Sequence, residues 1–179
     1  MSNQPKSDPR YPVGRFEPPA EYTPALRGQF ISQLAEAPSR LREAVRGLDA
    51  RQLRTPYREG GWTPAQIVHH VADSHLNAYT RFKLALTEDA PTIKPYMQDA
   101  WANQPDATDP DVEVSLVLLE ALHRRWVTLL RSLTPEQFAR VFVHPEMGRV
   151  TLDRTLGMYA WHGRHHAAHI TGLRSRMGW

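Results

Sequence analysis

The sequence predicts an all-α protein built as a bundle of four long helices. Two observations support this fold class: helix-capping residues precede long segments with helical apolar periodicity, and alternating segments typical of strands are almost absent. A length of 179 residues also suits one domain. We therefore expect a single domain over residues 21–179, preceded by an extended, proline-rich segment over residues 1–20.

The first two long helices are predicted over residues 23–47 and 63–87. The first follows a Thr-Pro pair and ends at a glycine. The second begins with a capping box, in which Thr63 and Gln66 can satisfy each other's free backbone amides, with Pro64 at the first helical position. These features make the start of the second helix the clearest boundary in the chain.

The last two long helices are predicted over residues 109–132, which open with Asp-Pro, and over residues 151–176, which a glycine follows. A small β-hairpin that pairs residues 141–143 with residues 149–151 is the one candidate for strands.

The connections are uneven in length. Residues 88–108 form a long segment, and connections of this length usually contain a short helix, which we expect around residues 98–103. Residues 48–53 are similar to residues 133–138, and each of the two segments follows a long helix. This similarity indicates two helical hairpins in which the second and fourth long helices occupy equivalent places.

Composition narrows the function classes. The chain has no cysteine, which excludes disulfides, thiolate zinc sites and a cysteine nucleophile, so histidine or carboxylate must hold any metal. The formal net charge is only +3 and the basic residues form no tract, so we do not expect nucleic-acid binding. There is no apolar run at the start of the chain and none long enough to span a bilayer. The expected location is therefore the cytoplasm, without membrane attachment.

Seven of the nine histidines form two clusters on the second and fourth predicted helices. These are His69, His70 and His75 in the first cluster, and His162, His165, His166 and His169 in the second. Histidines four residues apart lie on one helical face and can chelate one ion, with a third ligand from a neighbouring helix. The clusters therefore predict a metal site, although buried or surface histidines with structural roles would give a similar pattern.

Spacing alone leaves the ligands open. Both the pair His162 and His166 and the pair His165 and His169 have the required separation. On the second helix, the apolar stripe favours His69, because His70 falls on the opposite side of an ideal helical wheel.

Two strings identify a family. Residues 62–75, WTPAQIVHHVADSH, and residues 161–166, WHGRHH, resemble the DinB superfamily, and most closely its YfiT-like branch, whose members are named as metal-dependent hydrolases. Other segments resemble that branch too: residues 11–17, 81–88, 91–96 and 122–126. The resemblance implies a DinB-like four-helix bundle that forms a homodimer.

The resemblance also implies a ligand set. It places one ligand at the histidine eight residues after Trp62, which is His70, and two more at His162 and His166. We follow the resemblance, and His69 stays the alternative to His70. The implied cofactor is one divalent metal per subunit, with zinc expected and nickel as the alternative.

The function implied is a metal-dependent hydrolase, or a thiol S-transferase of the bacillithiol type. The metal would activate water or a low-molecular-weight thiol for attack on an electrophilic small-molecule substrate. The alternative is a non-catalytic metal-binding bundle that acts in a stress response.

Three further sets of residues are candidates for the site. Carboxylates of a thiol cosubstrate could bind to basic side chains: Arg81, Lys83, Lys94 and Arg164. Asp73 or Asn77 could hold the second ring nitrogen of a ligand. Three aromatic residues could line the pocket: Tyr96, Trp101 and Trp161.

Overall fold

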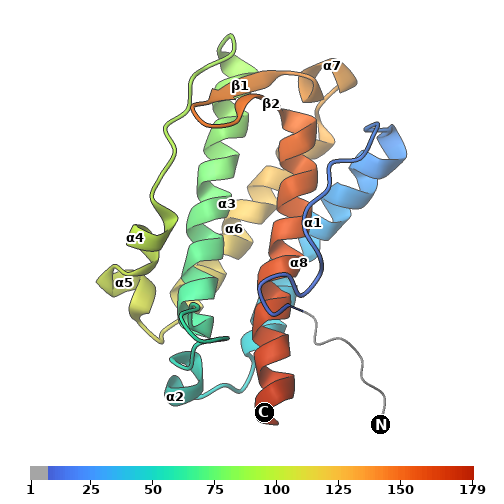
Figure 1. The fold of residues 1–179 in the computed structure, drawn as a ribbon. Helices are drawn as coiled ribbons and strands as arrows, with labels where there is room; N and C mark the ends of the chain where they lie inside the picture. The colour runs from blue at the N-terminus through green and yellow to red at the C-terminus, as the bar shows by residue number, and fades with distance from the viewer. Residues whose placement is uncertain (1–7) are drawn as a thin grey trace.

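The computed structural model describes residues 8–179 and confirms a four-helix bundle with one small hairpin (Figure 1). The long helices are α1 (Pro24–Val45), α3 (Pro64–Thr87), α6 (Glu113–Arg131) and α8 (Leu152–Met177). The short helices are α2 (Ala50–Leu53), α4 (Gln98–Ala102), α5 (Pro105–Thr108) and α7 (Pro135–Phe138). Strands β1 (Val141–His144) and β2 (Gly148–Thr151) pair antiparallel. Of the segment expected to be extended, residues 1–7 lie outside the described residues, and residues 8–20 contain turns but no helix or strand.

The predicted capping residues form the expected bonds. At the start of α3, the Thr63 hydroxyl accepts from the Gln66 amide at 3.2 Å, and the Gln66 side chain accepts from the Thr63 amide at 3.0 Å. One boundary was wrong: α6 begins at Glu113 and not at the Asp-Pro pair. The reason is that the backbone of Asp109 is extended and its carboxylate accepts from the Asp111 amide, which forms a turn before the helix.

The four long helices form a ring in which α1 packs on α8 and α6, and α3 packs on α6 and α8. Helices α1 and α8 run in the same direction. Two contacts show this: Arg27 binds Asp153 near the starts of the helices, and Arg174 binds the Ala44 carbonyl near their ends. Helices α3 and α6 are also parallel neighbours (Figure 1). A 24-residue helix is about 36 Å long. Because α3 and α6 are parallel, the connection between them must return over the full length of α3. This explains why the connection needs all of residues 88–112.

The two similar segments both fold as one-turn helices with a capping box. In α2 the box joins Asp49 to Gln52, and in α7 it joins Thr134 to Gln137. Figure 1 shows these helices at opposite ends of the bundle, as two related hairpins would place them.

The buried apolar residues form two clusters along the bundle. One cluster lies toward the hairpin and contains Trp126 and Leu156, and the other lies toward α2 and contains Val71 and Leu119. On α3, α6 and α8, buried histidines occupy positions between the residues of the two clusters. A polar layer therefore crosses the bundle where its two apolar regions meet. Within residues 8–179, no helix combines the length and the apolar character needed to cross a membrane.

Candidate metal centre

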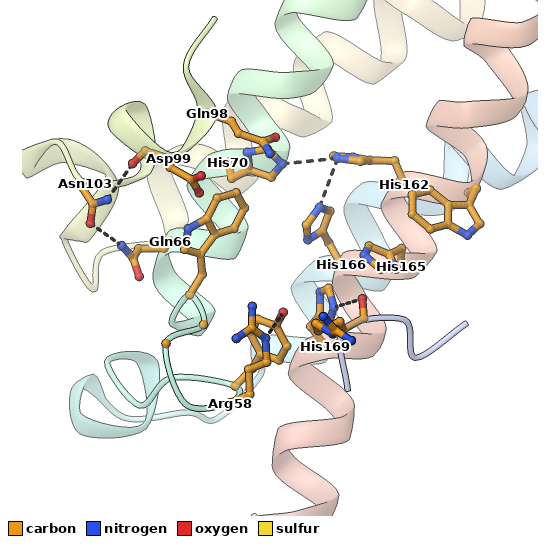
Figure 2. Close-up of a pocket in the computed structure, with 16 residues that line it drawn as sticks. Arg58, Gln66, His70, Gln98, Asp99, Asn103, His162, His165, His166 and His169 are labelled. Atoms are coloured by element: carbon orange, nitrogen blue, oxygen red, sulfur yellow. Dashed lines mark hydrogen bonds between the residues drawn. The ribbon is translucent and has the colours of Figure 1, made fainter. Parts of the chain in front are cut away.

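Three histidine side chains converge between α3 and α8 (Figure 2). The Nε2 atom of His162 lies 3.4 Å from Nε2 of His70 and 3.2 Å from Nε2 of His166. One ring nitrogen from each residue lies within 4.8 Å of the other two. Tetrahedral ligands at 2.0–2.1 Å from a zinc ion would be separated by about 3.3 Å, so the spacing fits a single ion.

Helix geometry and the packing of α8 on α3 explain how these residues meet. His162 and His166 are one turn apart on α8, and α8 packs against α3, which carries His70. The structure thus groups the three histidines that the family resemblance selects, out of the alternatives that the spacing left open.

His69 lies elsewhere, on the side of α3 that faces α6. Its Nε2 donates to the Asp109 carbonyl at 2.9 Å, and its Nδ1 accepts from the Ser115 hydroxyl at 2.7 Å. Both ring nitrogens are therefore engaged, and neither lone pair is free for a metal. The helical wheel assumed one buried face, whereas His69 and His70 are both buried because elements pack on both sides of α3.

The other pair with metal-ligand spacing also lies outside the group. The His165 ring stacks on Trp161 with a centroid distance of 4.2 Å, and the His169 ring packs on Tyr57 at 4.2 Å. The Nε2 atom of His169 lies 3.3 Å from the Arg10 carbonyl. These contacts give His165 and His169 packing roles beside the candidate ligands.

Burial keeps the candidate ligands neutral. It lowers the pKa of His70 to about 4, and the neighbouring His165 adds a smaller effect. The pKa values of His162 and His166 are well below 6.5, first because of burial and then because of the surrounding histidines. Neutral imidazoles offer lone pairs to a cation, so the donor set fits a divalent metal.

The second ring nitrogen of His162 has a partner that the sequence analysis missed. Its Nδ1 lies 3.1 Å from Nε2 of His75. Asp73 and Asn77, the residues expected in this role, form no hydrogen bond to a candidate ligand among the described residues, and the Asn77 amide donates instead to the Asp73 backbone carbonyl at 2.9 Å. The Nδ1 atom of His166 is buried and has no hydrogen-bond partner among the described residues.

The three histidines open into a cavity of about 760 Å³, which is large enough for a small molecule. Trp62 and Trp161 line it, and the Trp62 ring lies 4.5 Å from the His70 ring. The prediction for Trp161 thus agrees with the structure, whereas Tyr96 and Trp101 are not among the described lining residues and pack on each other at 4.7 Å.

The basic residues at this cavity are not the predicted ones. Arg10 and Arg58 line it, whereas the four expected side chains do not appear among its described lining residues: Arg81, Lys83, Lys94 and Arg164. Arg10 is paired with Asp8 at 2.8 Å, and Arg58 donates to the Tyr57 hydroxyl at 3.0 Å. No sequence pattern singled out Arg10 or Arg58, because both lie in irregular segments that only the fold brings to the cavity.

Comparison with known proteins supports this arrangement. The profile of the DinB superfamily matches residues 33–170. A Bacillus cereus protein named "Putative metal-dependent hydrolase" is 53% identical over 97% of this chain and 99% of its own length. A Bacillus mycoides protein with the same description is 52% identical over 96% of this chain and 99% of its own.

Two solved structures are similar as well. YfiT from Bacillus subtilis, described as having an unusual four-helix bundle topology, superposes with a TM-score of 0.93 at 48% identity, covering 96% of this chain and 98% of that one. TT2238, described as a four-helix bundle protein, superposes with a TM-score of 0.55 at 21% identity, over 86% of this chain and 99% of that one, and so shares the fold.

Proposed function

The chain belongs to the DinB superfamily, and from this membership we propose that it is a metal-dependent enzyme of the hydrolase type. One divalent ion is held by His70, His162 and His166. The observation that carries the proposal is the convergence of three neutral ring nitrogens at separations that suit one ion. The name shared by relatives more than 50% identical over nearly the whole chain supports the hydrolase class.

Each part of the site has a role in this proposal. The three imidazoles would hold the ion, and a set of three protein ligands is typical of catalytic centres, which keep a position for a reactant. When bound, the ion supplies Lewis-acid chemistry that lowers the pKa of a coordinated water or thiol. Trp62 and Trp161 give the cavity apolar walls that orient a substrate and displace water. Zinc is the proposed metal and nickel the alternative, since imidazole suits both.

Thiol transfer is the second candidate function, and the charge of the cavity favours it. Arg10 and Arg58 line the cavity with the three histidines, and a low-molecular-weight thiol of the bacillithiol type carries carboxylates. Arg10 is already paired with Asp8, so Arg58 is the better candidate for binding a carboxylate. The absence of cysteine from the chain is compatible with a thiol that comes from outside it.

Metal content is the first test. We expect the untagged protein to carry about one zinc per chain by elemental analysis, and His70→Ala and His162→Ala to lose it. His69→Ala is the matched control, because His69 uses both ring nitrogens in contacts to Asp109 and Ser115. Wild-type protein that takes up no zinc or nickel after reconstitution would contradict the proposal.

Turnover is the second test. We expect the zinc-loaded protein to convert an activated ester or a reactive halide, and His162→Ala to lose this activity. Turnover that requires an added thiol would favour the transferase, and then Arg58→Ala should raise KM for an acidic thiol but not for a neutral one. Zinc binding without turnover on either substrate would favour a non-catalytic metal-binding protein.

The homodimer implied by the family resemblance stays a prediction. On α6, three exposed apolar side chains lie on one helical face and are available for such a contact: Val114, Val117 and Leu118.

A further inference from the structure

A row of two buried histidines, His123 and His75, leads through the core to the half-buried His162 at the cavity. The Nδ1 atom of His162 lies 3.1 Å from Nε2 of His75, whose Nδ1 lies 2.8 Å from Nε2 of His123. The Nδ1 atom of His123 lies 2.7 Å from the Leu34 carbonyl oxygen. His75 is 0% exposed and His123 is 2% exposed, so water does not compete for these bonds. We call His123, His75 and His162 the histidine chain.

The Leu34 carbonyl determines where every hydrogen in the histidine chain lies. A carbonyl only accepts, so Nδ1 of His123 must carry a hydrogen, and in a neutral ring Nε2 is then bare. Bare Nε2 of His123 accepts from Nδ1–H of His75, which leaves Nε2 of His75 bare in turn. That atom accepts from Nδ1–H of His162. The only arrangement that satisfies all three contacts leaves Nε2 of His162 without a hydrogen, next to His70 and His166.

The rings are neutral because of their burial. Desolvation lowers the pKa of His123 to about 4, against a smaller opposing effect of the Leu34 carbonyl. It also holds the pKa of His75 well below 6.5. With the other tautomers unchanged, a proton added to Nε2 of His123 or His75 would place two N–H groups against each other, so burial and this hydrogen-bond pattern favour the same neutral state.

A proline makes the Leu34 carbonyl available. In an α-helix this carbonyl would accept from the amide four residues later, but that residue is Pro38, which lies inside α1 and has no N–H. The backbone of α1 therefore presents an unused acceptor to the core, and His123 occupies it from α6. With Leu34 on α1, His123 on α6, His75 on α3 and His162 on α8, all four long helices contribute to one line of hydrogen bonds.

We propose that His75 and His123 are positioning residues that fix His162 in its Nδ1–H tautomer, with the Leu34 carbonyl as the fixed end, so that the Nε2 lone pair is directed at the metal. This inference rests on the proposed metal-dependent function. The aromatic rings of Trp126 and Tyr159 pack edge-on against His75, at centroid distances of 6.0 and 5.0 Å, and restrict its rotation. His162 thus has the tautomer and orientation of a ligand before an ion binds. Hydrogen-bond partners of metal-ligating histidines generally fix these two properties.

The tautomers can be measured without any substitution. In ¹⁵N-histidine-labelled, metal-free protein, ring ¹⁵N shifts and couplings assign the hydrogen of each imidazole. We expect Nδ1–H on all three members of the histidine chain, whereas free neutral histidine favours Nε2–H. Nε2–H on His162 would overturn the inference.

Substitution of His75 tests the consequence for metal binding. His75→Phe keeps an aromatic ring but removes both hydrogen bonds, and we expect it to weaken zinc binding by about 10–100-fold in a chelator competition. His75→Gln supplies one donor and one acceptor, so it should recover part of that loss. His144→Phe in the hairpin is the control and should bind zinc as the wild type does. Zinc affinity in His75→Phe within about threefold of wild type would overturn the inference, because packing alone would then account for His75.

The two proposals fail in different ways. Wild-type protein with three Nδ1–H tautomers but no zinc uptake would contradict the metal-dependent function and support the tautomer assignment. Zinc uptake together with Nε2–H on His162 in the metal-free protein would support the metal-dependent function and overturn the tautomer assignment. Circular dichroism monitors folding of His75→Phe, and the tautomer measurement decides the inference if that variant does not fold.

Discussion

At the scale of single residues, the neutral state of His123 links folding to pH. Burial lowers its pKa from 6.5 to about 4 in the folded protein, so the unfolded chain takes up the proton first as the pH falls. Its contribution to stability is therefore complete above pH 6.5, decreases as the pH falls from 6.5 to 4, and stays constant below that. Between pH 7.5 and 4.5 we expect His123 to account for about 2–3 kcal/mol of lost stability.

Urea unfolding of metal-free protein checks this prediction. His123→Gln should lose less stability between pH 7.5 and 4.5 than the wild type does, because the titrating group is gone. His144→Gln is the control, since it removes a histidine of the hairpin, and should keep the wild-type slope. Equal slopes for His123→Gln and the wild type would show that His123 does not set this dependence.

Single residues also show what the sequence could and could not predict. The separation of four residues between His162 and His166 follows from helix geometry, so the sequence alone made them candidates. The choice of His70 over His69 needed the family resemblance, because a helical wheel describes one helix and not the elements packed on both sides of it. The partnership of His75 with His123 was not predicted, because it depends on how α3 and α6 are aligned.

At the scale of elements, Gly163 permits the close packing of α8 on α1. A Cβ atom at this position would lie 2.8 Å from Cβ of Ala37, closer than non-bonded carbon atoms approach in proteins. Gly163→Ala should therefore force the helices apart and destabilise the protein by about 1–3 kcal/mol. The displacement would also reach the adjacent His162, so zinc affinity should fall in parallel.

Gly28 provides a matched control for this substitution. It lies in α1 and is exposed, and a Cβ atom added there meets nothing within 4 Å. Gly28→Ala should stabilise the protein by about 0.5–1 kcal/mol, because alanine favours the helix. Urea unfolding of both variants measures the two effects, and a Gly163→Ala protein as stable as the wild type would refute the packing argument.

Elements with local signals were predicted and elements set by tertiary contacts were not. Threonine caps and their glutamine partners marked the start of α3, because a capping box acts within four residues. A long connection and a short helix near residues 98–103 also agree with the structure, where the connection covers residues 88–112 and α4 covers Gln98–Ala102. The short helices α2, α5 and α7 were not predicted as helices, because a single turn leaves too short a periodic pattern to detect.

At the scale of the whole molecule, metal binding should raise the free energy of unfolding and the melting temperature. A ligand that binds only the folded state at 100 times its Kd adds about 2.7 kcal/mol. For a chain of this length that corresponds to a rise in Tm of about 5–10 °C. We expect this difference between zinc-loaded and chelator-treated wild type.

The same variants test this prediction. His162→Ala should melt at one temperature with or without zinc, whereas His144→Ala should keep the full zinc-dependent rise. A wild-type Tm that does not respond to zinc would mean that the three histidines hold no ion in the folded protein.

The distance along the chain between the candidate ligands has a further consequence. His70 and His162 are 92 residues apart, whereas His162 and His166 are separated by one helical turn. Closing a loop of that length in a disordered chain costs about 4–5 kcal/mol of entropy. An unfolded chain therefore offers an ion two neighbouring imidazoles and not the third. The rate at which the ion is released into an excess of chelator would then report the rate at which α3 separates from α8, which is a step in the opening of the tertiary structure.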